Sequence, residues 1–464
     1  MADAGGRLHP PGRPRPPLPP GPFLIVGLAR SGVAAALALR ARGEEVIGCD
    51  ARTAQDPELR AAAERLSRAG VEVHLDASGD DLAARAGTLI KSPGVPQHAA
   101  AVVAARDRRL PVLGELELAW RLLPNEFVAV TGTNGKTTTT EWIGHIHRQA
   151  GVPVAVAGNV GTAVSSLVGE LSTDQTVVCE ASSFQLEDSD AFAPEEAVFL
   201  NLTRDHLDRH GSFAAYAAAK LRVFANQDSG DTAVVPDTFE RLLRTAGLAS
   251  PRLRARRFSF GEGDDATLRA GEGKLWWRGE ALLEIGAISL PGAHNVSNAM
   301  GAAAACLARG LGREAVTDGL RSFAGVAHRL ELVATRAGVS YVNDSKATNV
   351  ESTAVALATY PRGVHLIAGG RSKQQNFAPL APLVAARCEA VYLIGEASAE
   401  LAAALSATGV PVSAVGDLER AVASASVAAA PGEVVLLSPA CASYDAYRDF
   451  EARGEHFRAL VESL

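Results

Sequence analysis

The stretch Thr131-Gly132-Thr133-Asn134-Gly135-Lys136-Thr137 follows directly on the apolar run 127–130 and precedes a helical stretch that begins near Thr138. Glycines let backbone N–H groups turn toward phosphate oxygens, and a helix N-terminus favours negative charge. Lys136 would contact the β- and γ-phosphates, and the Thr137 hydroxyl would ligate Mg²⁺. The strict phosphate-loop pattern has glycine at 130, where this chain has valine, so the loop is a variant. We interpret it as an ATP-binding loop; the alternative is a structural glycine turn.

Polar side chains follow two further apolar runs of the same region. Glu180 comes directly after the run 176–179, and His206 lies in the polar segment that follows the run 197–200. The carboxyl ends of parallel strands meet at one edge of a sheet, so both side chains would lie near the phosphate loop. A carboxylate there would serve Mg²⁺. Each residue taken singly could equally be a loop cap or a solvated charge.

Short apolar runs alternate with alanine-rich helical stretches along most of the chain, which is typical of buried parallel strands with helical crossovers. The runs are 23–26, 45–48, 71–75, 88–90, 127–130, 154–156, 176–179, 197–200, 364–367, 391–394, 412–415 and 434–437. A Gly-rich texture around 256–285 predicts a small antiparallel patch. We therefore predict an α/β chain with a Rossmann-like N-terminal domain, a central ATPase-like domain with a mostly parallel sheet, and a Rossmann-like C-terminal domain. The expected ranges are a disordered Pro-rich tail at 1–21, then domains at 22–118, 119–325 and 326–464.

The outer domains carry their own strand-end motifs. Gly27-Leu28-Ala29-Arg30-Ser31-Gly32, with Asp50 after the next run, resembles a dinucleotide fingerprint in which Ala29 replaces the middle glycine. This substitution weakens an NAD interpretation, and a tight turn without a ligand is the alternative. Gly94 follows another run and could cap an anion. In the last domain Lys373 and Ser443 lie at strand ends and suit a small carboxylate, although a solvated lysine is the default.

Composition limits the classes of function. The chain has 464 residues, 47% of them hydrophobic and 21% charged, and a net charge of −7, which excludes wholesale disorder and argues against nucleic-acid binding. No apolar run approaches the roughly 18 residues that a membrane span needs. The five cysteines form no CxxC pair, so we expect a reduced cytoplasmic protein without a disulfide framework or zinc site. We also expect a monomer.

Several motifs occur together in this chain: TGTNGKT, the Glu180 strand end, NLTRDHLDRH, YAAAKL, PGAHNVSNA, AHR, NDSKATN and LSPACAS. The combination resembles the Mur ligases from about Phe23 to Leu464. The resemblance implies ATP-driven amide formation in the cytoplasmic stage of peptidoglycan synthesis. ATP would phosphorylate the terminal carboxylate of UDP-N-acetylmuramoyl-L-alanine, and the amine of D-glutamate would attack the acyl phosphate. ATP and Mg²⁺ are the implied cofactors, and these small molecules are the only implied partners.

The resemblance also carries residue roles onto matching positions. Nucleotide contacts fall on Gly132, Thr133, Asn134, Gly135, Lys136, Thr137, Thr138, Asn295, Arg329 and Asp344. The metal falls on Thr137, Glu180, His206 and a carbamylated Lys220, and the catalytic residues are Lys136, His206 and Lys220. The UDP-substrate falls on Ser31, Asp50, Arg52, Gly94 and Asn159, and D-glutamate on Lys346, Thr348, Lys373, Ser443 and Phe450.

Three other functions compete with this interpretation. The first is another ATP-dependent amide ligase, either a Mur enzyme that adds a different amino acid or a folylpolyglutamate synthetase. The second is an NAD-dependent oxidoreductase built on the first domain, which Ala29 and the unused phosphate loop make improbable. The third is a non-catalytic scaffold, which would leave the polar strand ends without a purpose.

Overall fold

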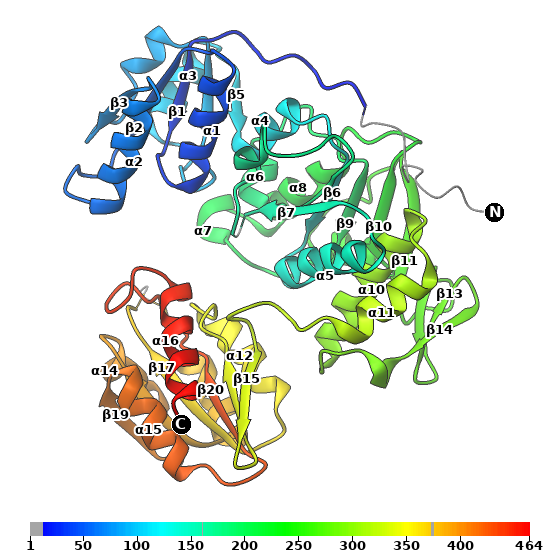
Figure 1. Cartoon of the computed structure of the whole chain (residues 1–464), viewed down its shortest axis with the longest axis vertical. Coiled ribbons are helices and arrows are strands. Elements are labelled where there is room, and N and C mark those ends of the chain that lie inside the picture. The colour runs from blue at the N-terminus through cyan, green and yellow to red at the C-terminus, as the bar shows by residue number, and fades with distance from the viewer. Residues whose placement is uncertain (1–12, 160, 373–374) are drawn as a thin grey trace. The chain divides into compact units, whose positions relative to one another are not determined.

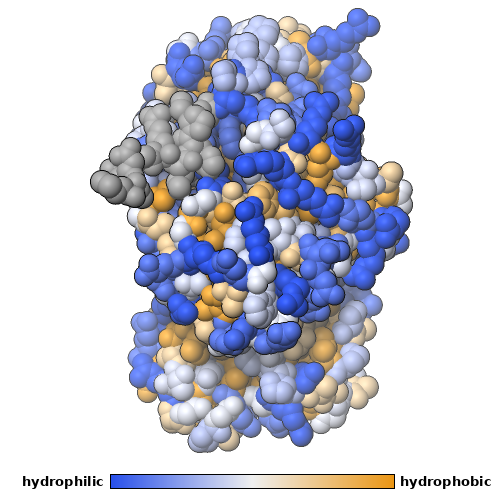
Figure 2. Space-filling view, turned by 90° about the vertical axis from the view of Figure 1, so that its right-hand side faces the viewer, coloured by the Kyte–Doolittle hydropathy of each residue, from blue (hydrophilic) through white to orange (hydrophobic). Residues whose placement is uncertain are grey.

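The computed structural model describes residues 13–159, 161–372 and 375–464. The chain forms two compact units, divided between Phe323 and Ala324. Both units are α/β with mostly parallel sheets, so the α/β part of the predicted fold class is confirmed (Figure 1). The face seen in Figure 2 is mostly hydrophilic with scattered hydrophobic patches. Within the described residues, no helix combines the length and the apolar character that crossing a bilayer requires.

The smaller sheet of the first unit has five parallel strands in the order β3-β2-β1-β4-β5. The strands are β1 (Phe23–Val26), β2 (Val46–Asp50), β3 (Glu72–Leu75), β4 (Thr88–Lys91) and β5 (Val112–Gly114), and the helices are α1 (Arg30–Ala41), α2 (Pro57–Arg68) and α3 (Ala100–Asp107). Phe23 and Ile25 face one hydrophobic core, and Leu24 and Val26 face another on the opposite side. This two-sided burial is why the strand is continuously apolar.

The larger sheet of the first unit has nine strands in the order β14-β13-β12-β11-β10-β9-β6-β8-β7. The strands are β6 (Phe127–Thr131), β7 (Val154–Gly158), β8 (Thr176–Glu180), β9 (Glu196–Phe199), β10 (Thr232–Pro236), β11 (Arg256–Gly261), β12 (Leu268–Gly271), β13 (Lys274–Trp277) and β14 (Glu280–Glu284). The predicted antiparallel patch is present in β12 to β14, whereas β11 pairs in parallel with β10.

Eight helices of the described residues accompany the larger sheet. They are α4 (Glu115–Leu122), α5 (Lys136–Gln149), α6 (Ser183–Glu187), α7 (Leu207–His210), α8 (Phe213–Leu221), α9 (Phe239–Thr245), α10 (Ala293–Ala308) and α11 (Arg313–Ser322). Helices α5, α10 and α11 pack against one another (Figure 1). The parallel register places Glu180 of β8 opposite Val130 of β6, and Phe199 of β9 opposite Thr131. The segments after β6, β8 and β9 therefore meet at one edge, as the sequence predicted.

The second unit holds one six-stranded sheet in the order β15-β16-β20-β17-β18-β19. The strands are β15 (Glu331–Arg336), β16 (Val339–Asn343), β17 (Val364–Gly369), β18 (Cys388–Ile394), β19 (Val412–Gly416) and β20 (Val434–Leu437). Its helices are α12 (Val350–Thr359), α13 (Ala381–Arg387), α14 (Ser398–Leu405), α15 (Leu418–Ala428) and α16 (Phe450–Glu462). Only β15 among these strands pairs antiparallel, and hydrophobic cores cover both faces of the sheet.

The described part of the expected disordered tail, residues 13–21, is an extended segment packed on the first unit. The Arg15 guanidinium lies 4.5 Å from the centroid of the Trp120 ring and donates to Glu195 Oε1 at 3.0 Å. Arg13 pairs with Asp231, and the carbonyl of Pro20 accepts from the Thr88 hydroxyl at 2.8 Å. Proline prevents a helix or ladder here, but the arginines still anchor the segment through side-chain contacts. The prediction of disorder is therefore wrong for this part.

We expect Arg15→Ala to lower the free energy of unfolding by about 1–3 kcal/mol, because it removes a buried charge-assisted hydrogen bond and a cation–π contact. Thermal denaturation of the whole chain measures the change. Arg42→Ala, at the exposed end of α1, is the control and leaves the melting temperature near that of the wild type. Equal melting temperatures for the two variants would contradict the packing of this segment.

Candidate active site

The phosphate loop ends in a glycine that no other residue can replace without strain. Gly135 has a φ of +82° and lies at the N-terminus of α5, where no side chain caps the helix. A Cβ atom on Gly135 would lie 2.0 Å from Oδ1 of Asn298, which projects from α10. The close packing of loop and helix therefore holds the first N–H groups of α5 in place for an anion.

Asn201, two residues after β9, braces the other side of the loop. Its Oδ1 accepts from the N–H groups of Thr133 and Asn134 at 3.1 and 2.9 Å, and its Nδ2 donates to the Asn134 carbonyl at 3.0 Å. The Lys136 ammonium donates a hydrogen bond to the Thr133 carbonyl at 2.9 Å. The loop is thus held rigid by side chains from its neighbours, which is the preorganisation that phosphate transfer needs.

Oxygen ligands for a cation meet beside the loop. The Thr137 hydroxyl donates to Glu180 Oε2 at 2.6 Å, and Asn159 Nδ2 donates to Glu180 Oε1 at 3.2 Å. A hydroxyl and a carboxylate are hard oxygen donors, so this pair fits Mg²⁺, which commonly takes one or two protein ligands and completes its shell with phosphates and water. No group of three or more His, Cys, Asp or Glu side chains suited to a metal occurs in the described part of the chain.

Lys220 is buried beneath the loop. Its ammonium donates to the Gly132 carbonyl at 2.7 Å and lies 4.6 Å from the centroid of the Tyr216 ring, whose hydroxyl donates to Thr133 Oγ1 at 3.1 Å. Burial, together with the nearby Lys136 charge, holds the pKa of Lys220 well below its usual range. Lys220 therefore loses its proton more readily than an exposed lysine does.

His206 lies at the start of α7 with a φ of +51°, an unusual backbone conformation for a residue other than glycine. Its ring is 4.8 Å from that of Phe184 and 6.3 Å from that of Tyr216, and its side chain is 48% exposed. Strained residues of this kind are concentrated at functional sites. The structure thus places His206 close to the Lys220 side of the loop while leaving the ring accessible.

The predicted UDP-substrate residues lie at the edge of the smaller sheet, apart from Asn159. The Asp50 carboxylate accepts from the Leu28 N–H at 2.8 Å and from Arg52 Nη2 at 2.9 Å, so it fastens the loop after β1 to the end of β2. Burial opposes its ionisation, but the hydrogen bonds from Arg52 and Leu28 hold the pKa of Asp50 below its usual value. Gly94 is exposed, with open space where a side chain would lie.

The second unit brings the NDSKATN and SPACAS motifs together around Asp344. This carboxyl accepts from the Ser438 hydroxyl at 2.7 Å and from the Leu330 N–H at 3.1 Å, and burial raises the pKa of Asp344 to about 7. The buried Arg453 of α16 donates to the Ser345 carbonyl at 2.9 Å and to the Cys441 carbonyl at 3.1 Å. One guanidinium therefore joins both motifs.

The other predicted residues of the second unit lie around these motifs. Lys346 Nζ is 6.0 Å from the centroid of the Phe450 ring, and the Thr348 N–H donates to the Lys346 carbonyl. Ser443 is buried, Arg329 follows the buried His328, and Lys373 lies outside the described residues. In the first unit, Asn295 Oδ1 is 3.4 Å from Asn298 Nδ2, which brings Asn295 close to the phosphate loop.

Four residues that the structure places in these groups have no role predicted from the sequence: Asn201, Tyr216, Asn298 and Arg453. Asn201 and Tyr216 lie inside quoted motifs, and Asn298 follows Asn295 by three positions and so shares its helix face. Spacing could have identified these three. Nothing local in the sequence distinguishes Arg453 from a surface arginine.

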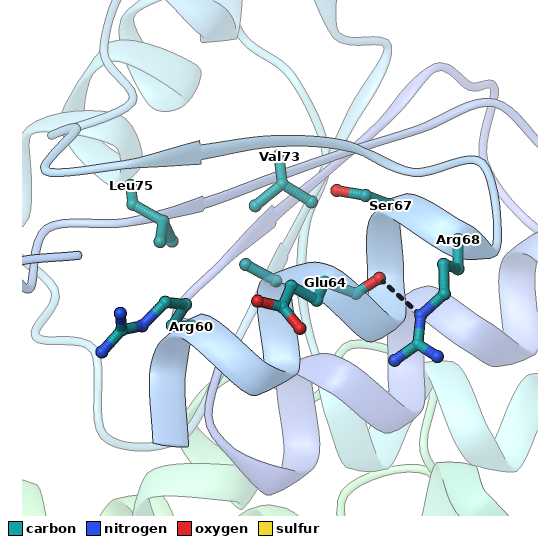
Figure 3. Close-up of a pocket in the computed structure, with 7 residues that line it drawn as sticks. Arg60, Glu64, Ser67, Arg68, Val73 and Leu75 are labelled. Atoms are coloured by element: carbon teal, nitrogen blue, oxygen red, sulfur yellow. Dashed lines mark hydrogen bonds between the residues drawn. The ribbon is translucent and has the colours of Figure 1, made fainter. Parts of the chain in front are cut away.

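Two open grooves of the first unit contain none of the predicted residues. The first lies between α2 and β3, has a volume of about 460 Å³ and is lined by Arg60, Ala63, Glu64, Ser67, Arg68, Val73 and Leu75. Val73 and Leu75 point from the strand toward the helix, where the Arg68 Nε donates to the Glu64 carbonyl (Figure 3). The second, of about 600 Å³, lies near Asp237 and Arg257. No residue of the phosphate loop is among those that line either groove.

Comparison with known proteins identifies the class. The loop, the Thr137–Glu180 pair and the parallel sheet have an arrangement typical of α/β proteins with a phosphate-binding loop. A family model for the Mur ligase middle domain matches residues 130–306, and one for the Mur ligase glutamate ligase domain matches residues 328–441. The chain belongs to the Mur ligase family.

Curated relatives match nearly the whole chain. The UDP-N-acetylmuramoylalanine–D-glutamate ligase of Acidobacterium capsulatum is 43% identical over 448 residues, covering 94% of this chain and 95% of the relative. The protein of the same name from Pelotomaculum thermopropionicum is 40% identical over 444 residues, covering 95% and 97%.

Solved structures share the fold. UDP-N-acetylmuramate–alanine ligase from Thermotoga maritima matches with a TM-score of 0.59 and 21% identity, over 96% of this chain and 99% of that one. The MurF ligase of the same organism, solved with ADP, matches with a TM-score of 0.56 and 16% identity, over 91% and 90%.

We expect Gly135→Ala to abolish ADP binding and to lower the melting temperature, because the added methyl group requires an unfavourable φ and meets Asn298 at 2.0 Å. Gly151→Ala is a matched control: it has a φ of +67° just beyond α5, but open space around the added atom. Calorimetric titration with ADP distinguishes the two variants. Wild-type ADP affinity in Gly135→Ala would contradict the loop assignment.

Proposed function

We propose that the chain joins D-glutamate to UDP-N-acetylmuramoyl-L-alanine with ATP, releasing ADP and phosphate, in the cytoplasmic stage of peptidoglycan precursor synthesis. One observation carries the proposal: a braced phosphate loop with Thr137, Glu180 and a buried Lys220 lies in a chain 43% identical to a ligase of that name. We expect the protein to act as a monomer on small-molecule substrates.

We assign one task to each predicted domain. Residues 22–118 bind the UDP-substrate through Ser31, Asp50, Arg52 and Gly94, with Asn159 added from the central domain. Residues 119–325 bind ATP, and residues 326–464 bind D-glutamate. The assignment is supported by the open space at Gly94 and by the exposed position of Asn159. Arg329 and Asp344 would contribute nucleotide contacts, and Lys346, Thr348, Lys373, Ser443 and Phe450 would bind the amino acid.

The reaction begins with attack of a carboxylate oxygen of UDP-N-acetylmuramoyl-L-alanine on the γ-phosphorus. The bond between that phosphorus and the bridging oxygen breaks, ADP leaves, and an acyl phosphate forms. The residues around the loop act by position and charge, because phosphoryl transfer needs little covalent help from the protein. Lys136 and the N-terminus of α5 stabilise negative charge on the transferred group.

The second step joins the amino acid. The neutral amine of D-glutamate attacks the carbonyl carbon, and the tetrahedral intermediate expels phosphate with the oxygen that carried it. The nitrogen loses a proton to water as the amide forms. Mg²⁺, when bound, supplies charge neutralisation on the phosphates, and Thr137 and Glu180 would hold it. Asn201 and Asn298 keep the loop from moving while this charge changes.

Lys220 would serve as a carbamate. The ammonium first loses one proton; addition of the resulting amine to CO₂ then forms a C–N bond and releases a second proton, which leaves an anionic oxygen ligand. The lowered pKa of Lys220 favours this addition, because only the unprotonated amine is nucleophilic. His206, with its accessible ring, lies on the same side of the loop and would complete the metal and catalytic residues.

Phosphate release from ATP with Mg²⁺ and UDP-N-acetylmuramoyl-L-alanine tests the proposed function when amino acids are added one at a time. We expect release with D-glutamate, and none above background with L-glutamate or L-lysine. Release with a different amino acid would overturn the substrate assignment. A protein that releases no phosphate with any of them, although it is folded by circular dichroism, would contradict the ligase function.

Lys220→Ala tests the carbamate separately. We expect a loss of activity of at least about 100-fold that small carboxylates such as acetate or formate partly restore, because they can occupy the space of the missing anion. Lys274→Ala is the control, since this lysine pairs with Glu284 in the hairpin of β13 and β14. A Lys220→Ala variant that carboxylates do not restore, together with wild-type activity that is indifferent to CO₂ removal, would count against the carbamate.

A further inference from the structure

A buried ion pair joins the two sheets of the first unit beside the expected UDP-substrate loop. Lys91 is the last residue of β4, and its Nζ lies 2.7 Å from Oδ2 of Asp188, the residue that ends α6. The two side chains are 0% and 4% exposed. Lys91 belongs to the smaller sheet and Asp188 to the segment between β8 and β9 of the larger sheet, so the pair crosses the border between them.

This pair is not explained by stability alone. Transferring two charges from water to a protein interior is unfavourable, and a well-packed hydrophobic pair is often as stable or more so. Burial lowers the pKa of Lys91, and Asp188 opposes that shift. Both members of the pair also make directional hydrogen bonds, Lys91 to the Val95 carbonyl and Asp188 from Gln97, which fix geometry in a way that apolar packing does not.

The segment 92–97 is what the pair holds. Lys91 Nζ also donates to the Val95 carbonyl at 2.7 Å, and Gln97 Nε2 donates to Asp188 Oδ1 at 2.7 Å. The Asp188 carbonyl in turn accepts from the Gly114 N–H at 2.7 Å. Asp188, which lies in a connection between strands of the larger sheet, thus contacts Lys91, Gln97 and Gly114 on the side of the smaller sheet.

A second cationic side chain, from the segment that carries His206, contacts the Val95 carbonyl. Arg209 of α7 donates from Nη2 to the Val95 carbonyl at 2.8 Å, and its guanidinium lies 4.9 Å from the centroid of the Phe184 ring. Arg209 is three residues from His206, and Phe184 contacts the His206 ring. The Val95 carbonyl is therefore shared by one donor from the substrate-binding sheet and one from the segment that carries His206.

The N-terminal end of segment 92–97 contacts the loop that follows β1. The Ser92 hydroxyl donates to the Gly27 carbonyl at 2.6 Å, and a Cβ atom on Gly27 would lie 2.8 Å from a methyl group of Val95. Gly94 lies between these anchors with open space around it. The exposed Gly94 thus lies on a loop that is fixed at both ends.

We propose that Lys91, Asp188 and Arg209 are positioning residues that hold segment 92–97 at a fixed place relative to the phosphate loop, so that a UDP-sugar substrate bound at Gly94 extends its carboxylate toward ATP. The proposal rests on the proposed function, which supplies the substrate. None of the three side chains needs to contact that substrate: each acts through the Val95 carbonyl or through another of the three.

The test compares Lys91→Met, which strands a buried aspartate, with Lys91→Met/Asp188→Asn, which removes both charges. We expect the double variant to regain most of the melting temperature that the single variant loses, because no uncompensated charge remains. Both variants should nevertheless raise KM and the calorimetric Kd for UDP-N-acetylmuramoyl-L-alanine by about 10-fold, with the KM for ATP changed less than about 2-fold. Arg209→Lys should lie between wild type and Arg209→Met, because a shorter cation is retained.

Arg121→Met is the matched control. Arg121 forms another buried pair of the first unit, with Glu117 at 2.7 Å, but has no contact with segment 92–97 among its hydrogen bonds and ion pairs. We expect it to lower the melting temperature without changing KM for the UDP-substrate. A double variant with wild-type KM and Kd would overturn the positioning role, as would an equal rise in the KM for ATP. A wild-type protein that neither binds nor turns over the UDP-substrate would instead overturn the proposed function, and the positioning role with it.

Discussion

The contact between Gly135 and Asn298 is the constraint on which the central site depends. The glycine adopts a left-handed conformation that strains any other residue, and a Cβ atom there would lie 2.0 Å from the Asn298 amide oxygen, so the side chain from α10 packs directly against the phosphate loop. Asn201 fixes the opposite side through three hydrogen bonds. The loop is therefore held by Asn201, which follows β9, and packed against Asn298 of α10, with the N-terminus of α5 at the same site.

Charge around this loop is arranged for a reaction in which negative charge moves. Lys136 lies on the loop, Glu180 and Thr137 offer oxygen ligands beside it, and burial keeps Lys220 from holding a proton tightly. Burial and the positive charge of Lys136 both disfavour the protonated form of Lys220. The same logic extends to the border with the smaller sheet, where buried charges fix a backbone carbonyl rather than react.

The sequence predicted most parallel strands from their apolar runs, and it missed β5, β10, β15 and β16. Burial alone does not separate the two groups, because β10 is fully buried and was missed, whereas the largely exposed β19 was predicted. The apolar runs at 23–26 and 434–437 coincide with β1 and β20, since both faces of those strands are covered. β5 is only three residues long and β15 is half-exposed at a sheet edge, so neither has a continuous apolar pattern. Motifs located the loop and Glu180, but pairs such as Lys91 and Asp188 join distant segments that no spacing rule connects. The anchoring of residues 13–21 was missed because composition describes the prolines and not what the arginines contact.

The proposed reaction depends on an acyl phosphate, formed when the substrate carboxylate is phosphorylated before the amine attacks. Its most direct test uses UDP-N-acetylmuramoyl-L-alanine labelled with ¹⁸O in the alanine carboxylate, turned over with ATP, Mg²⁺ and D-glutamate. The account predicts that one labelled oxygen passes to each phosphate released, because the oxygen that attacks the γ-phosphorus leaves with it when the amide forms. Phosphate without the label, formed at the same rate as the amide product, would contradict an acyl phosphate and with it the role given to the loop.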